Sequence, residues 1–392
     1  MVVWRSALPL IIAVALMTFE HWVTIPSCEV VSRDNVEDDS TKDSGELKVM
    51  MVANLLLLGS EAGYTNIYFR DSFTAKFFRK SFHSLKPDML IVLGDVSARG
   101  SDLTHDKWLS VIQQLQRMLG PFLGLPLHIV LGDRDIGECS KINAKFVNRI
   151  ASNFPGLDSA GCGSFEVSNI SFVSLNAVAL LCGDNDLRFG VEKIIEKESV
   201  DLQTHTNAAT EIANETTNSE TNFSNFVWRE NTMLSGSGPV LLLHFPLHST
   251  LNSNCAAVNA LNQSPSPCHH KSLKTFGNRR LAGAGPYDLL HTVPPNETEY
   301  IFQALKPRII FSAHTHEFYD RTHRDGTREV TVPAMTWDGR DDPGFVVATF
   351  GQKRAVTVIR CFLARESHIV MAYVSVLVLL LSVAILPSGS TR

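Results

Sequence analysis

Six residues of the chain have side chains that could bind a metal ion, and each of them follows an apolar run of sequence. They are Asn54, Asp95, Asp133, His244, His314 and His316. Carboxylates and imidazoles are the usual protein ligands of manganese, iron and zinc. A single Gly-Asp or His-x-His motif is common in turns and on surfaces. The repeated placement of such residues after apolar runs is what predicts a metal site.

The spacing of these residues is compatible with one shared site. His314 and His316 lie two positions apart, directly after an apolar run. In extended backbone, side chains two positions apart point to the same side, so both imidazoles can face one site. Asp95 and Asp133 each follow an apolar run through a glycine, which lets the chain turn sharply at that point.

The elements that carry these residues alternate between predicted strands and predicted helices. Apolar runs predict buried strands at 48–58, 89–93, 127–131, 240–243 and 308–311. Helices are predicted at 72–85, 107–119 and 297–305, and a hairpin at 163–176. This alternation predicts an α/β fold whose sheet has a parallel portion. In such sheets, ligands bind beyond the carboxyl ends of the strands.

The order of the motifs resembles that of the calcineurin-like metallophosphoesterases, whose signature runs D-x-H, GD, GNH[DE], H and GHxH. The corresponding motifs here are Asn54-x-Leu56, Gly94-Asp95, Gly132-Asp-Arg-Asp135, His244 and Ala313-His-Thr-His316. Several stretches look more specifically like the branch that removes ethanolamine phosphate from GPI anchors. They are LKPDMLIVLGD (85–95), SFVSLNAVAL (171–180), HFPL (244–247), FSAHTH (311–316) and Val332 to Trp337.

The resemblance implies a fold and an activity. The family has a sandwich of two mixed sheets flanked by helices, binds two metal ions, commonly manganese, and cleaves phosphate esters. Carried over to this sequence, Asp95 would bridge both metals. Asp133, His244 and His314 would complete the first metal site, which has no missing ligand. The implied cofactor is therefore a divalent metal, with Mn²⁺ as the expected ion.

The second metal site departs from the family pattern. It would have Asp95, His316 and also Asn54, which stands where the family has an aspartate. Leu56 stands where the family has a histidine, and a leucine side chain has no atom that can bind a metal. We therefore expect one tight metal site and a weakened second site.

Arg134 stands at the position of the family's acid/base histidine. Arginine does not release its proton near neutral pH, and losing a general acid costs ~10²–10⁴ in rate. The guanidinium could instead clamp a phosphate group, or it could only pair with Asp135 or another acidic neighbour.

Two functions are therefore open at the level of sequence. One is a phosphoesterase that removes ethanolamine phosphate from GPI-anchor glycans and so aids the transport of GPI-anchored proteins. The other is a pseudoenzyme that binds metal and a GPI glycan or cargo.

Two apolar segments bracket the predicted domain. Residues 1–28 contain an apolar stretch behind Arg5, which fits either an uncleaved membrane anchor or a signal peptide. Residues 368–387 contain an uncharged apolar run that is long enough to span a bilayer as a transmembrane helix. Between them, residues 29–46 are predicted to form a polar linker and residues 47–365 a lumenal domain. Residues 201–236 are predicted to be an exposed insertion in that domain.

Sequons and cysteines favour a lumenal location in the secretory pathway, and the resemblance implies the endoplasmic reticulum or Golgi. The Asn-x-Ser/Thr sequons are at Asn169, Asn214, Asn222, Asn262 and Asn296. Seven cysteines without a CxxC motif predict disulfides in an oxidising compartment, with at least one cysteine left over. Cys255 and Cys268 flank one polar loop and are the predicted pair.

The charge of the chain restricts its partners. The formal net charge is −5 and no basic stripe is present. Nucleic acid is therefore not an expected partner. The expected partners are the lipid bilayer and GPI-anchored proteins or their glycan.

Overall fold

The computed structural model describes residues 2–32, 46–182, 186–214, 236–248, 292–351 and 355–385. The predicted Cys255–Cys268 pair and the sequons at Asn222 and Asn262 lie outside these residues.

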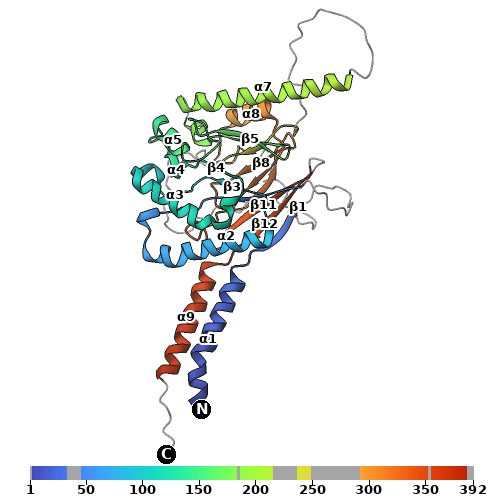
Figure 1. Ribbon diagram of the computed structural model, residues 1–392. Coiled ribbons are helices and arrows are strands. Elements are labelled where there is room, and N and C mark those ends of the chain that lie inside the picture. Colours follow the sequence, from blue (N-terminus) through green and yellow to red (C-terminus); the bar gives the residue numbers. More distant parts are fainter. Residues whose placement is uncertain are drawn as a thin grey trace, which may run out of the picture.

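Two six-stranded mixed sheets form the centre of the protein (Figure 1). The first sheet has the order β1 (Ser27–Ser32), β12 (Val356–Phe362), β11 (Gly344–Phe350), β2 (Leu47–Val52), β3 (Met89–Leu93), β4 (Leu127–Val130). The second has the order β5 (Gly163–Val167), β6 (Ile170–Ser174), β7 (Val240–Leu242), β8 (Ile309–Ser312), β10 (Arg328–Thr331), β9 (Tyr319–Thr322). Strands β2, β3 and β4 are parallel, as are β6, β7, β8 and β10. The predicted α/β fold with two mixed sheets is confirmed.

The two sheets pack face to face through the apolar side chains of their central strands. Successive side chains of a strand point to opposite faces. Val49 and Met51 of β2 therefore belong to the core between the sheets, together with Phe311 of β8. Met50 belongs to the outer core, which includes Phe77 of a covering helix.

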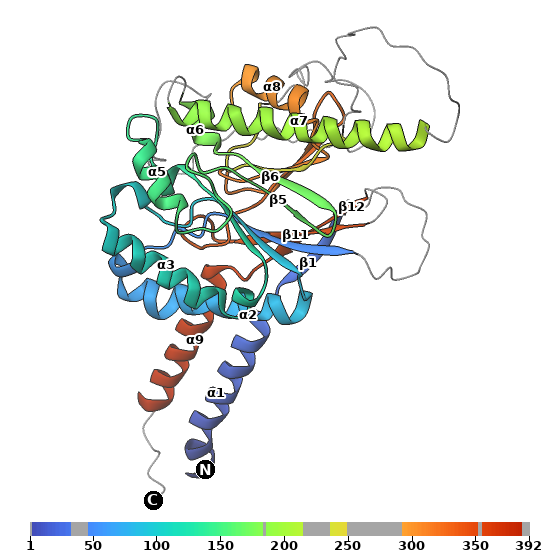
Figure 2. The same ribbon diagram turned by 45° about the horizontal axis from the view of Figure 1, so that its top comes forward.

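Helices cover both outer faces of the sandwich (Figure 2). Helices α2 (Asp71–Leu85) and α3 (His105–Leu119) cover the first sheet, and α7 (Asp186–Asn214) and α8 (Pro295–Leu305) cover the second. Short helical segments complete the loops: η1 (Gly59–Glu61), η2 (Asn66–Arg70), η3 (Gly100–Asp102), η4 (Gly120–Gly124), α4 (Asp133–Ile136), α5 (Ala144–Ala151) and α6 (Ala177–Leu181). The helices α2, α3 and α8 lie where the sequence predicts them.

Helices α1 (Val2–Val23) and α9 (Glu366–Ile385) lie side by side and leave the same side of the sandwich (Figures 1 and 2). Glu20 of α1 accepts a hydrogen bond from the Tyr373 hydroxyl of α9 and pairs with Lys76 of α2 at 2.6 Å. Within the described part of the chain, no helix combines the length and the apolar character that crossing a membrane requires. The two terminal membrane spans stay a prediction.

Two predicted segment boundaries differ from the structure. The linker predicted at 29–46 begins later, because β1 pairs with β12 at the edge of the first sheet. A disulfide between Cys28 and Cys361 joins these two strands. Helix α7 continues to Asn214, into the insertion predicted at 201–236. Its first half packs on the core through Leu187, Val191 and Ile195, which are four residues apart and so lie on one face of the helix. The helix continues beyond this packed half to Asn214.

A second disulfide joins Cys139 and Cys182, which are 43 residues apart, and Cys162 is buried and free. We expect Cys139→Ser to lower the free energy of unfolding by about 2–4 kcal/mol, because the cross-link restricts the unfolded chain. Urea unfolding without reductant measures this loss. The Cys139→Ser/Cys182→Ser double variant serves as the control, and it should lose no more than the single variant. Additive losses would show that the two cysteines are not joined.

Candidate metal centre

The predicted ligands lie beyond the carboxyl ends of parallel strands in both sheets. Asp95 follows β3, and Asp133 follows β4 at the start of α4. His244 follows β7, and His314 follows β8. The structure brings Asp133, His244 and His314 together, so that one ligand atom of each lies within 4.8 Å of the others. The cluster therefore joins the first sheet to the second.

The two glycines that precede the aspartates allow the close approach of these segments. Gly94 has φ +82°, and a Cβ atom at this position would come within 2.3 Å of His244 Nδ1. At Gly132, a Cβ atom would lie 2.2 Å from Asp95 Oδ1. Any larger residue at either position would displace a side chain of the cluster.

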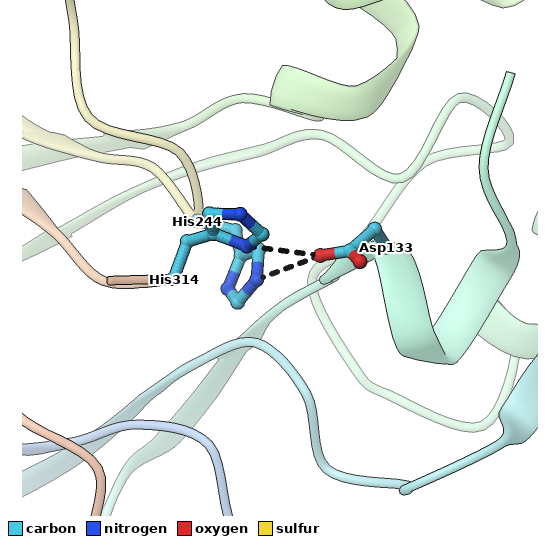
Figure 3. A group of neighbouring side chains, drawn as sticks. All are labelled: Asp133, His244 and His314. Carbon is cyan, nitrogen blue, oxygen red and sulfur yellow. Dashed lines mark hydrogen bonds and ion pairs between the residues drawn. The ribbon is translucent and has the colours of Figure 1, made fainter. Parts of the chain in front are cut away.

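Both imidazoles of the cluster converge on one oxygen of Asp133 (Figure 3). The distance from Asp133 Oδ1 to His244 Nε2 is 3.1 Å, and the distance to His314 Nδ1 is 3.2 Å. Asp95 Oδ1 lies 3.5 Å from the same His244 Nε2. His244 Nδ1 lies 2.8 Å from the carbonyl oxygen of Leu93 and donates to it, so Nε2 is the nitrogen that faces the carboxylates. Metal-binding histidines typically have this arrangement.

The charges of the cluster depend on one another. Burial would lower the pKa of His244, but Asp95 and Asp133 raise it to about 9. Burial would raise the pKa of Asp133, but hydrogen bonds from His244 and His314 hold it well below its usual range. The pKa of Asp95 is raised well above its ordinary value, chiefly by burial.

The cluster fits a divalent metal ion. It offers two imidazole nitrogens and carboxylate oxygens from Asp133 and the adjacent Asp95, which is a donor set that transition metals prefer. The carboxylates of Asp95 and Asp133, which raise the pKa of His244, would equally favour a divalent ion bound at these atoms.

The other two predicted ligands, Asn54 and His316, do not join this cluster, and Leu56 offers no ligand atom. Asn54 is fully buried, and neither atom of its amide group has a hydrogen-bond partner within the described residues. Leu56 is buried, with an exposed fraction of 6%. His316 forms a hydrogen bond with the backbone of Gly339, and burial lowers its pKa to about 4.

Arg134 pairs with Asp95. Its backbone N–H donates to Asp95 Oδ1 at 3.1 Å, and its Nε lies 3.6 Å from Asp95 Oδ2. The Asp135 carboxylate is occupied elsewhere, since it accepts hydrogen bonds from the backbone N–H groups of Val96, Ser97 and Gly132. The sequence left open whether Arg134 pairs with Asp135 or with another acidic neighbour. In the structure its partner is Asp95.

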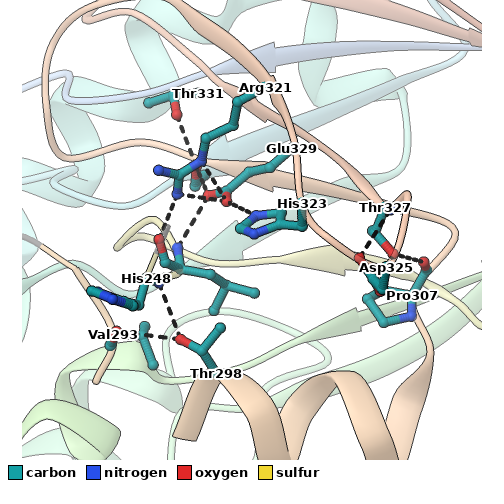
Figure 4. Close-up of polar contacts among 12 residues, drawn as sticks. His248, Val293, Thr298, Pro307, Arg321, His323, Asp325, Thr327, Glu329 and Thr331 are labelled. Carbon is teal, nitrogen blue, oxygen red and sulfur yellow. Dashed lines mark hydrogen bonds and ion pairs between the residues drawn. The ribbon is translucent and has the colours of Figure 1, made fainter. Parts of the chain in front are cut away.

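A buried network around Glu329 supports the loop that follows His244 (Figure 4). The Glu329 carboxylate accepts hydrogen bonds from the backbone N–H of Leu247 at 3.1 Å and from the Ser312 hydroxyl at 2.7 Å. Its other oxygen pairs with Arg321 and lies 2.7 Å from His323 Nε2. The sequence does not predict this network. The signal that it offers is an acidic residue, Glu329, directly before the strand-like stretch Val330-Thr-Val332.

Comparisons with known proteins place the chain in a family. Residues 68–318 match the family model described as calcineurin-like phosphoesterase. Similar proteins include Metallophosphoesterase 1 of Pongo abelii, which is 25% identical over 83% of this chain and 74% of its own length. Metallophosphoesterase 1 of Xenopus laevis is 27% identical over 88% of this chain and 78% of its own length.

Solved structures with a similar chain path include two phosphatases. A dimetal phosphatase from Danio rerio is 13% identical, with a TM-score of 0.41, over 77% of this chain and 92% of its own. A purple acid phosphatase from yellow lupin is also 13% identical, with a TM-score of 0.40, over 78% of this chain and 50% of its own. The family model covers more than half of this chain, and the chain therefore belongs to the calcineurin-like phosphoesterase family.

Proposed function

We propose that this protein is a metal-dependent phosphoesterase with one tightly bound divalent ion, which we expect to be Mn²⁺. The observation that carries the proposal is the convergence of Asp133, His244 and His314 beyond the strands of a calcineurin-like phosphoesterase domain. A divalent ion at this position supplies Lewis acidity toward a phosphate ester and activates water for attack.

The protein's own groups orient the centre and add positive charge beside it. The Leu93 carbonyl fixes the ring of His244. The Arg134 side chain is 32% exposed, so part of its guanidinium remains open to a phosphate group while it pairs with Asp95. Guanidinium groups bind phosphate oxygens through paired hydrogen bonds. In this role, Arg134 stabilises charge that develops on the phosphate and transfers no proton.

The proposed substrate is ethanolamine phosphate attached to a GPI-anchor glycan. Support comes from the stretches 171–180 and 311–316, which resemble the branch that acts on GPI anchors, and from the similarity to Metallophosphoesterase 1 proteins. The partners would then be GPI-anchored proteins whose transport the reaction assists.

We further propose that the protein works in the lumen of the endoplasmic reticulum or Golgi, attached to the membrane through its two terminal segments. The two disulfides support an oxidising compartment. Asn169, one of the sequon residues, is exposed at the turn between β5 and β6 and is open to glycosylation. Exposed apolar side chains on α1 and α9 support contact with lipid, among them Met17, Met371 and Leu377.

Release of phosphoethanolamine from a GPI glycan tests the proposed function. The full-length protein in detergent should release it when Mn²⁺ is present and stop when a chelator removes the metal. Arg134→Ala should slow the release on the order of 10²-fold, as expected when a group that stabilises the transition state is lost.

The departures at Leu56 and Arg134 favour one alternative, a pseudoenzyme that binds metal and GPI glycan without hydrolysis. In that case the native protein would bind the glycan and release no phosphoethanolamine at any Mn²⁺ concentration. A native enzyme whose rate does not respond to Arg134→Ala would contradict only the role given to Arg134.

A further inference from the structure

We infer that the guanidinium of Arg134 takes the place of a second metal ion, so that the centre combines one divalent ion with one built-in cation. The inference rests on the proposed metal site at Asp133, His244 and His314. It concerns the region around the other oxygen of Asp95.

The two oxygens of Asp95 face two different cationic groups. Oδ1 lies 3.5 Å from His244 Nε2, on the side of the three-residue cluster. Oδ2 lies 3.6 Å from Nε of Arg134. A carboxylate that bridges two metal ions binds one ion through each of its oxygens. In Asp95, the oxygen that would bind a second ion is Oδ2, and the guanidinium of Arg134 lies beside it.

The residues around this position offer fewer ligands than the family pattern requires for a second ion. Leu56 is buried and has no donor atom. His316 bonds to the backbone of Gly339 through one ring nitrogen, as metal-binding histidines do, and is the one imidazole that the pattern leaves for a second ion. Asn54 offers only a neutral amide. Of the residues that the family pattern assigns to the second ion, Asp95 alone is acidic, and it already pairs with Arg134.

On the side of the second ion, two changes relative to the family pattern offset each other. Asn54 in place of an aspartate removes one negative charge, and a guanidinium in place of a divalent ion removes one positive charge. On the side of the first ion, Asp133 stands where the family has an asparagine and adds one negative charge. The two changes on the side of the second ion are needed together, because a buried carboxylate without a cation is strongly unfavourable.

The surroundings of Asn54 agree with this balance. Its backbone N–H donates to the carbonyl of Gly94 at 3.1 Å, which places it directly beside Asp95 in the fold. Its side chain is fully buried and finds no hydrogen-bond donor within the described residues. A carboxylate at this position would have no protein N–H to stabilise it and would depend on a cation.

Metal stoichiometry in a set of variants tests the inference. The native protein should bind about one Mn²⁺ per chain tightly. The Asn54→Asp/Leu56→His double variant restores the family's ligands but keeps Arg134, and it should still bind about one. Adding Arg134→His to this double variant should raise the number to about two.

Two measurements give the readout independently of activity. Elemental analysis after gel filtration counts the ions, and electron paramagnetic resonance distinguishes an isolated Mn²⁺ from an exchange-coupled pair. A second triple variant carries Arg134→Gln in place of Arg134→His and keeps a flexible polar side chain at this position. It serves if the first triple variant fails to fold, which circular dichroism detects. It should also bind the second ion, because the guanidinium is gone.

Three results would overturn the inference: a coupled ion pair in the native protein, a coupled pair in the double variant, or only one ion in both folded triple variants. The proposed function fails separately. A native protein that binds one ion but hydrolyses no phosphate ester would remove the proposed activity and leave the inference about Arg134 standing.

Discussion

Replacing His244 with alanine is expected to abolish tight metal binding and to reduce hydrolysis by at least ~10²-fold. Even groups that only support metal ligands change metal affinity by about 10–100-fold, and His244 is a ligand itself. Its Nε2 lies within 3.5 Å of both Asp95 and Asp133, so the substitution removes a nitrogen donor that faces both carboxylates. Titration calorimetry with Mn²⁺ measures the affinity, and phosphoethanolamine release measures the rate.

A second buried histidine provides the matched control for this variant. His128 is 4% exposed and lies 2.8 Å from the Ser174 hydroxyl, outside the cluster. His128→Gln also removes a buried imidazole and keeps a group that can bond to Ser174. It should leave the Mn²⁺ affinity unchanged. If His244→Ala retains the native affinity, the metal does not bind at this cluster.

Removing the carboxylate of Glu329 is expected to have the largest effect on stability. Glu329→Ala leaves Arg321 and His323 without their acidic partner and also leaves the backbone N–H of Leu247 unbonded. Breaking a buried ion pair by deleting one partner costs about 3–5 kcal/mol. Urea unfolding at neutral pH measures the change. Because Leu247 lies in the loop that follows His244, the Mn²⁺ affinity should fall as well, by about 10–100-fold.

The pH dependence of stability gives this prediction a second readout. Burial would raise the pKa of Glu329, but His323, Arg321 and Ser312 outweigh burial and lower it. A group with a lowered folded-state pKa contributes its stability above its unfolded pKa, which is about 4.3 for glutamate. That contribution disappears as the pH falls through the folded-state pKa. The native protein should therefore lose stability in acid, and Glu329→Ala should lose less.

An ion pair on the same sheet serves as the control for Glu329. Asp320 of β9 pairs with Arg328 of β10 at 2.7 Å near the surface. Asp320→Asn should cost less than Glu329→Ala, because Asp320 is 22% exposed and the amide oxygen of asparagine can still accept a hydrogen bond from Arg328. A Glu329→Ala protein that unfolds like Asp320→Asn would show that the network does not support the domain.

The strands that carry the metal ligands could be predicted from the sequence because burial on both faces leaves a continuous apolar run. Strand β3 was predicted at its observed bounds, and the helix predicted at 72–85 matches α2 within one residue. Convergence at the carboxyl ends of parallel strands brings together residues of one sheet, whereas the approach of Asp133 in the first sheet to His244 in the second was implied only by the family resemblance. The residue types also predict which metal site is complete, and that assignment stays a prediction.

The remaining features depend on contacts between distant parts of the chain. Cys28 and Cys361 are 333 residues apart, and no local pattern links β1 to its partner strand. The charged partner of Arg134 depends on how the segment after β4 lies against the segment after β3. Glu329 lies in β10, a short stretch that predicts only a strand, and its partners come from β8, β9 and the loop after β7.

Titration of the metal-free protein with Mn²⁺, while hydrolysis of a phosphoethanolamine-bearing GPI glycan is followed, tests the central claim most directly. The account predicts a rate that rises with bound metal and levels off at about one equivalent per chain, because Asp133, His244 and His314 form the only complete site that the ligand residues offer in the described part of the chain. An absence of hydrolysis at every metal concentration, or a rate that levels off only at about two equivalents, would contradict it.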